Sequence, residues 1–293
     1  MKRKVTIFDW LIWAVLVIAA FSCLAPVLNA IAISFSDKTS ATLGHVYFWP
    51  KNFNLSSYRK ILEEPQFFRS FGNSLIRVLI GGSINVAFAI LMAYPLSQSK
   101  QVFHQRNVYM WLIVFTMLFS GGLVPSFILV RNLRLMDTIW ALVLPGAVPV
   151  FSVILLMNFF KGIPRALEEA AIMDGANPLY TLVNIFVPLA KPAIATITLF
   201  AVVGHWNSFF DGKIYINTPA KIPLQTYIQS LSVQIDPTKL SSMSREEIVQ
   251  QLERSNLTFN SAKIVVSMVP ILLIYPLLQK YFVTGIVMGA VKE

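Results

Sequence analysis

The sequence predicts an all-α polytopic membrane protein with six transmembrane helices, and three observations support this prediction. Hydrophobic residues make up 56% of the chain and charged residues only 13%, whereas soluble domains usually carry about a quarter charged residues. The mean hydropathy of the chain is +0.64. Apolar segments of about 20 residues, the length that crosses a bilayer, recur from end to end. Much of the surface is therefore expected to face lipid.

The first predicted helix, 8–34, follows the basic cluster Lys2-Arg3-Lys4. Its apolar stretch begins near Val5 and ends near Ile33, which is too long for the signal-peptide core of about 7–15 residues. We therefore expect it to remain in the protein as a membrane helix. The other predicted spans are 74–96, 108–130, 140–160, 189–210 and 262–283. Several contain prolines, which membrane helices tolerate because neighbouring groups satisfy the freed backbone.

An even number of spans places both termini on the same side of the membrane. The cluster Lys2-Arg3-Lys4 favours the cytoplasm for that side, because short cytoplasmic segments are enriched in basic residues. The loop 161–188, between the fourth and fifth helices, is then cytoplasmic. The two long loops, 35–73 and 211–261, are then external. All of 1–293 is expected to form one transmembrane domain.

The chain lacks the constellations that carry catalysis or hold a cofactor. It contains no phosphate-binding loop G-x-x-x-x-G-K-[ST], no HExxH pair and no G-x-S-x-G elbow. His45, His104 and His205 fall in separate segments without metal-ligand spacing. We expect no catalytic residue, no metal site and no bound cofactor. The net charge of +10 is spread through short loops, which does not indicate nucleic-acid binding, and Cys23 is given a packing role.

The cytoplasmic loop carries the most informative pattern, which predicts two short helices. Pro164 suits the first position of a helix, and Gly175 suits the left-handed residue that ends one. Asn177 and Pro178 then read as the N-cap and first residue of a second helix.

One face of the first short helix is expected to meet another protein. The residues that share this face at helical spacing are Leu167, Ala170, Ala171 and Asp174. Alanines allow close approach, and the carboxylates of Glu168 and Glu169 suit a basic partner. The alternative is a helix lying on lipid, but such helices favour a Lys-rich polar face and bulky apolar residues. Partner docking is the interpretation we favour.

The same stretch resembles the EAA loop of ABC-importer permeases, whose pattern is EAA-x3-G-x9-I-x-L-P. The matching residues are Glu169-Ala170-Ala171, Gly175 after three residues, and Ile185-Phe186-Val187-Pro188 after nine more. Only Val187 departs, standing where leucine is usual. The stretches 119–125, 204–208 and 275–283 are also similar to carbohydrate-uptake permeases, the group of the second membrane subunit of the maltose importer. The similarity is closest to the branch that handles complex oligosaccharides and polysaccharides such as alginate.

This resemblance implies a subunit of a larger assembly in the bacterial inner membrane. Its expected partners are a homologous second permease, two ATPase subunits that bind the ATP, and an extracytoplasmic solute-binding protein. In that family the EAA helix sits in a cleft of the ATPase. The residues expected to couple to the ATPase are therefore Glu168, Glu169, Ala170, Ala171, Asp174 and Gly175. In that family the tail can also reach the ATPase, so the resemblance makes Met288–Glu293 a candidate secondary contact.

Polar residues near the external ends of two spans are candidates for the substrate pathway. The residues are His205, Trp206, Asn207 and Asp211 near the fifth span, with Asn73 and Arg77 near the second. Polar groups in membranes usually face a cavity, and an aromatic ring beside hydrogen-bonding groups suits a sugar. The alternatives are an interfacial role for Trp206 and a helix–helix hydrogen bond for Asn207.

These features predict a permease for an oligo- or polysaccharide that works by alternating access. External Arg131, Arg134 and Lys213 favour an acidic, alginate-like substrate, and the long loop 211–261 is expected to contact the binding protein. An ion-driven secondary transporter is the alternative. It would need paired ionisable groups in its spans, and apart from Arg77 we expect none. A membrane-embedded enzyme would need the missing catalytic residues.

Overall fold

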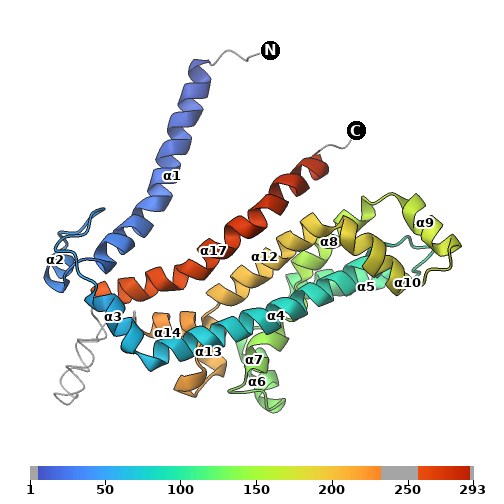
Figure 1. Cartoon of the computed structure of the whole chain (residues 1–293). Coiled ribbons are helices and arrows are strands. Elements are labelled where there is room, and N and C mark those ends of the chain that lie inside the picture. Colours follow the sequence, from blue (N-terminus) through green and yellow to red (C-terminus); the bar gives the residue numbers. More distant parts are fainter. Residues whose placement is uncertain (1–5, 232–256, 291–293) are drawn as a thin grey trace. The chain divides into compact units, whose positions relative to one another are not determined.

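The computed structural model describes residues 6–231 and 257–290, which are helices, turns and loops without any β-strand (Figure 1). The all-α prediction is confirmed for these residues. They form two compact units, one from residues 6–67, 227–231 and 257–269, and one from 68–226 and 270–290. The expected docking stretch Met243–Arg254 and the last three residues of the tail lie outside the described residues.

The first unit contains the N-terminal helix and short helices that follow it. Its elements are α1 (Ile7–Ser34), α2 (Lys38–Thr42), α3 (Ser56–Glu63), the start of α4 (Pro65–Ser97), most of α14 (Leu224–Leu231) and the first part of α17 (Leu257–Ala290). Thr6 caps α1 in a capping box with Asp9, which satisfies backbone donors at the helix start.

The second unit holds most of α4 and the central helices. Its remaining elements are α5 (Arg106–Leu118), α6 (Leu123–Asn132), α7 (Ile139–Val143), η1 (Leu144–Gly146), α8 (Val150–Lys161), α9 (Arg165–Met173), α10 (Pro178–Thr181), η2 (Leu182–Phe186), α11 (Val187–Leu189), α12 (Lys191–Asn207), α13 (Phe210–Tyr215) and η3 (Pro219–Lys221). Small residues of α4, Ala89 and Ala93, are fully buried against α8 and α12. Alanines let helices approach closely where lipid supplies no hydrophobic drive.

Three described helices are long and apolar enough to cross a membrane, namely Ile7–Ser34, Pro65–Ser97 and Leu257–Pro276. Three bent pairs meet the same test only when their halves are taken together. They are Arg106–Leu118 with Leu123–Asn132 (111°), Ile139–Gly146 with Val150–Lys161 (47°), and Pro178–Leu189 with Lys191–Asn207 (85°). The expected number of six is reached if each bent pair is one span, but the fifth span would then begin at Pro178, inside the expected loop 161–188, and not at residue 189.

Two spans expected as single helices are broken. The segment 108–130 is interrupted after Leu118, and Gly122 has a φ of +85°, a conformation that glycine adopts without steric cost. The segment 140–160 is interrupted between α7 and α8. Pro145 in η1 and Pro149 at the N-cap of α8 lack the N–H that a continuous helix needs. Hydropathy reports total length and cannot locate such breaks.

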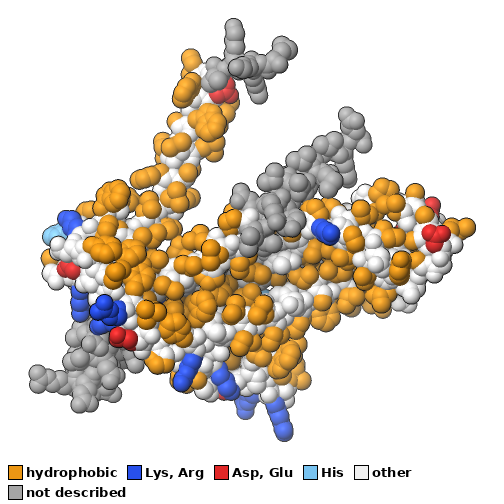
Figure 2. Space-filling view, viewed as in Figure 1, with side chains coloured by type: hydrophobic (Ala, Val, Ile, Leu, Met, Phe, Trp, Pro, Cys, Tyr) orange, Lys and Arg blue, Asp and Glu red, His pale blue; other side chains and the backbone are white. Residues whose placement is uncertain are grey.

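Much of the hydrophobic surface is exposed. Figure 2 shows apolar side chains over most of the visible face, and none of the apolar window of α1 is buried. Soluble proteins rarely expose apolar patches of this extent. This distribution fits a protein whose solvent is lipid.

A buried ion pair in the first unit contradicts the expectation that, Arg77 apart, the spans lack ionisable groups. Lys263 of α17 is 1% exposed, and its Nζ lies 2.6 Å from a carboxylate oxygen of Glu64 and 2.9 Å from the hydroxyl of Tyr227. Nζ also lies 3.9 Å from the ring centroid of Phe259. One lysine near the end of an apolar run hardly lowers its mean hydropathy, so the pattern did not single it out.

Candidate functional site

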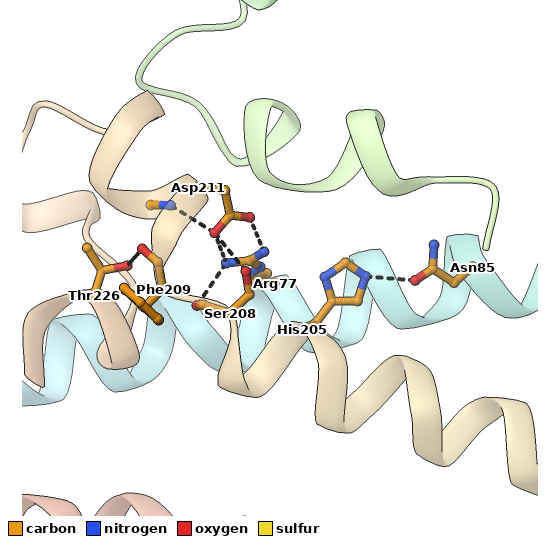
Figure 3. Close-up of polar contacts among 8 residues, drawn as sticks. Arg77, Asn85, His205, Ser208, Phe209, Asp211 and Thr226 are labelled. Carbon is orange, nitrogen blue, oxygen red and sulfur yellow. Dashed lines mark hydrogen bonds and ion pairs between the residues drawn. The ribbon is translucent and has the colours of Figure 1, made fainter. Parts of the chain in front are cut away.

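The centre of the second unit contains a buried ion pair between α4 and α13 (Figure 3). The guanidinium of Arg77, which is 2% exposed, contacts both carboxylate oxygens of Asp211, and its Nη1 lies 3.1 Å from Oδ1. Asp211 also accepts hydrogen bonds from the Ser208 hydroxyl at 2.9 Å and the Gly212 N–H at 2.8 Å. A buried charge persists only when it is paired and hydrogen-bonded. The two candidate residues therefore act as a unit.

A second polar contact joins α4 to α12, between His205 and Asn85 (Figure 3). The Asn85 amide nitrogen donates to the carbonyls of Gly146 at 2.7 Å and Ala147 at 3.0 Å. This orients Asn85 Oδ1 toward His205 Nε2, 2.9 Å away, so Nε2 is the donor. An ideal Cβ on Gly81 would lie only 2.5 Å from Nε2. Glycine at this position therefore makes room for the imidazole.

These contacts border a pocket of about 560 Å³ formed by α4, α7, η1, α8, α12 and α13. Its polar lining includes Arg77, Asn85, Ser152, His205, Ser208 and Asp211. Phe151 and Phe200 supply aromatic rings 6.1 Å apart on its apolar side. A mixture of a few fixed polar groups and apolar walls is typical of small-molecule sites.

The structure separates the candidate pathway residues. Arg77, His205 and Asp211 line the pocket. Trp206 is 3% exposed and packs edge-to-face on Phe71 with ring centroids 5.5 Å apart, so its indole is not part of the pocket lining. The Asn73 amide donates to the Ala220 carbonyl at 2.8 Å, and Asn207 is exposed at the end of α12.

The loops beside this region are fixed by Asp137. Its carboxylate accepts hydrogen bonds from the Thr218 N–H at 2.9 Å, the Thr218 hydroxyl at 2.7 Å and the Lys221 ammonium at 2.8 Å. The hydrogen bond from Lys221, followed by those from Thr218, holds the pKa of Asp137 well below its ordinary value. Arg131, Arg134 and Lys213 are exposed. Figure 2 shows basic side chains at the lower edge of the view, where Figure 1 labels α6.

The loop 161–188 folds locally as the sequence predicts. Helix α9 ends before Gly175, whose φ is +80°, and the Asn177 side chain caps α10 by accepting from the Tyr180 N–H at 2.8 Å. Pro164 is the N-cap of α9 rather than its first helical residue. The first helical residue is thus one position later than the sequence predicts.

The orientation of α9 divides the residues expected to couple to the ATPase into an inward-facing group and an exposed group. The Glu168 Oε1 accepts hydrogen bonds from the Tyr94 hydroxyl at 3.0 Å and the Gln98 amide at 2.8 Å, both on α4. Ala171 is also turned inward, at 8% exposed. Five of the residues expected at the surface are exposed, namely Leu167, Glu169, Ala170, Asp174 and Gly175. The outer surface is also apolar, since Ile172 and Met173 are exposed.

Comparison with known proteins gives these sites a context. The chain is 38% identical to the polygalacturonan/rhamnogalacturonan transport system permease protein YtcP of Bacillus subtilis over 292 residues, which covers 100% of both chains. The chain belongs to the sugar-transport permeases of ABC importers. The permease is also 39% identical to Protein LplC of Bacillus subtilis, over 91% of this chain and 88% of that protein. No family model matches it.

Solved structures agree with this assignment. The permease resembles a chain from the crystal structure of "a bacterial ABC transporter involved in the import of the acidic polysaccharide alginate", with a TM-score of 0.84 and 32% identity. The match covers 96% of the permease and 100% of that chain. A second alginate ABC transporter structure, in complex with a pentasaccharide-bound periplasmic protein, matches at a TM-score of 0.57 and 16% identity. That second likeness concerns the fold alone.

Sequence reasoning missed two residues that organise the sites. Asn85 orients His205, and a polar amide inside the apolar segment 74–96 was a usable signal. Tyr94 holds Glu168 to α4, but nothing in the sequence connects these residues, which lie 74 positions apart. Only the tertiary packing of α9 against α4 reveals that contact.

Proposed function

We propose that this permease forms half of the translocation pathway of a binding-protein-dependent importer for an acidic oligo- or polysaccharide. One observation carries the proposal. The full-length relative YtcP is described as a polygalacturonan/rhamnogalacturonan permease, and the structural relative belongs to an alginate importer. Polygalacturonan and alginate are both polymers of uronic acids. Two relatives with this shared substrate chemistry favour a uronate-containing saccharide.

The pocket of about 560 Å³ is the part of this chain that we assign to the pathway. Arg77 and Asp211 neutralise each other's charge, so this ion pair does not concentrate anions in the pocket. We assign attraction of the acidic chain to Arg131, Arg134 and Lys213, which are exposed. The pocket then contributes hydrogen-bonding groups and aromatic walls to a passing sugar.

Energy enters through partner subunits. We propose that two ATPase subunits bind ATP and receive the exposed surface of α9, where Glu169, Ala170 and Asp174 lie beside Met173. A homologous second permease completes the pathway, and a solute-binding protein delivers the saccharide. Both termini lie in the cytoplasm, and the six spans cross the bacterial inner membrane.

Glu168 has a different role in this proposal. Because its carboxylate is held by Tyr94 and Gln98 of α4, it transmits the movement of α9 to a helix that also carries Asn85 and Arg77. Tyr94 and Arg77 are separated by roughly 26 Å along α4 at 1.5 Å per residue. Alternating access then follows from displacement of α4 against α12 and α13.

Co-purification tests the assembly. The tagged permease is expressed with its chromosomal neighbours and isolated in mild detergent, and the subunits are identified by mass spectrometry. The proposal predicts two ATPase copies and one second permease per tagged chain. A Glu169→Lys variant should lose ATPase, whereas Lys213→Gln, on the opposite predicted side, should retain it. Isolation of a stable complex without any ATPase would contradict the proposal.

A further inference from the structure

The described part of the second unit contains another cavity, of about 320 Å³, at the base of α9. Most of its lining residues come from the ends of four helices or the loops beside them, and Phe186 comes from η2. Arg106 is the first residue of α5, Lys161 is the last residue of α8, Arg165 is the first residue of α9, and Ser97 ends α4. The cavity shares Glu168 and Gln98 with the proposed coupling contact, but the proposed saccharide pathway does not use it.

The cavity has an excess of positive charge. Three cations line it, Arg106, Lys161 and Arg165, and Glu168 is the one carboxylate among its lining residues. Glu168 is engaged through Oε1 by the side chains of Tyr94 and Gln98. Among the side chains that the structure describes, those of residues 6–231 and 257–276, no ion pair joins any of the three cations to a carboxylate. Like charges held together in this way favour a bound anion.

One of the three cations is held in place by a hydrogen bond to the backbone. The Nε of Arg106 donates to the Leu96 carbonyl at 2.7 Å, which fixes the guanidinium plane beside the end of α4. Phe160 and Phe186 give the cavity an apolar wall, with their rings edge-to-face and centroids 5.3 Å apart. The site thus combines basic groups with an apolar wall, an arrangement that suits a charged headgroup with a hydrocarbon backbone.

We infer that this cavity binds the phosphodiester headgroup of an anionic phospholipid. Three apolar helices begin or end at the cavity, α4, α5 and α8, which places it at a membrane–water boundary. Basic pockets between membrane helices on the cytoplasmic side recognise such headgroups. The inference rests on the proposed function in its assignment of this boundary to the cytoplasm.

A lipid in this position would lie beside the contact that joins α9 to α4. Glu168 lines the cavity and also accepts from Tyr94 and Gln98. A phosphodiester there would meet the same cations that face the Glu168 carboxylate. Occupancy by lipid and the contact between α9 and α4 are therefore electrostatically coupled.

The test uses the full importer complex in phosphatidylcholine nanodiscs doped with phosphatidylglycerol, with bound lipid counted by native mass spectrometry. The variant is Lys161→Gln with Arg165→Gln, because both side chains are exposed. We expect its affinity for phosphatidylglycerol to fall roughly 25-fold, at about fivefold for each basic residue removed. The matched control, Arg131→Gln with Lys213→Gln, removes the same charge from exposed positions elsewhere and should bind as wild type does. Lys161→Arg with Arg165→Lys should also retain the lipid.

Three results would overturn the inference. Equal lipid retention by wild type and by the double variant Lys161→Gln with Arg165→Gln would show that the cations bind no headgroup. Equally tight binding of inorganic phosphate in pure phosphatidylcholine nanodiscs would assign the site to a soluble anion. Loss of ATPase subunits from the variant with unchanged lipid would make the cations a protein contact. Failure of the proposed function is distinguishable, because it appears as no uronate-stimulated ATP hydrolysis in the wild-type complex, whatever its lipid count.

Discussion

The buried pair Arg77–Asp211 gives an asymmetric prediction for single substitutions. Asp211→Asn leaves the Arg77 guanidinium uncompensated, and that residue is 2% exposed. Arg77→Met leaves a carboxylate whose side chain is 25% exposed and which still accepts from Ser208 and Gly212. Breaking a buried pair by removing one partner costs about 3–5 kcal/mol. We expect Asp211→Asn to fall in that range and Arg77→Met to cost distinctly less.

The double variant Arg77→Met with Asp211→Asn completes a double-mutant cycle with the two single variants. Removal of both charges should recover most of the loss, because replacing a whole buried pair is often nearly neutral. A loss of about 4 kcal/mol is close to a thousandfold in the folding equilibrium, which is large enough to read as the fraction of permease that remains monodisperse after graded heating in detergent. Equal losses in the two single variants, or a double variant as unstable as Asp211→Asn, would refute the reasoning.

Three other predictions concern different parts of the chain. Gly175→Val should lower transport and stimulated ATP hydrolysis together at normal abundance, because a β-branched residue is strained at a φ of +80°. Gly72→Ala, where a new Cβ would lie in open space, is the control. Normal transport by Gly175→Val would contradict the coupling role. Gly81→Ala should cost about 1–3 kcal/mol in thermal stability, since the new Cβ would lie 2.5 Å from His205 Nε2, and an unchanged melting temperature would show that the helices can separate freely. The lowered pKa of Asp137 stabilises the folded loops above the ordinary carboxyl pKa of about 4, and the effect is lost as pH falls through the lower folded value. Protease cleavage near Lys221 should therefore be constant from pH 8 to about pH 5 and rise in stronger acid, whereas Asp137→Asn should be cleaved faster at neutral pH; equal cleavage of both proteins at pH 7 would refute the anchoring role.

The sequence was sufficient for the helical class and for the local fold of the loop 161–188. Hydropathy depends on total apolar length, so it located the apolar segments without showing that 108–130 bends by 111°. Gly175 and Asn177 specify their own backbone through steric and capping effects, which act over a few residues. Those features were predictable because their causes are local.

The functional groupings were harder to predict because they depend on distant partners. The resemblance to the EAA loop placed Glu168 among the residues that couple to the ATPase, but its carboxylate turns inward to the Tyr94 hydroxyl. Trp206 was expected beside a sugar, yet it packs on Phe71. Periodicity gives the direction of a side chain around its own helix and cannot say which other helix lies there.

Transport by the reconstituted complex tests the central claim most directly. Proteoliposomes containing the permease, its partner permease, the ATPases and the binding protein are supplied with uronate oligosaccharides or with neutral oligosaccharides of equal length. ATP hydrolysis and uptake are measured at low and high salt. The account predicts that uronate oligosaccharides stimulate both activities more strongly, and that the preference weakens with salt as attraction by exposed basic groups is screened. Equal or greater stimulation by the neutral sugars would contradict it.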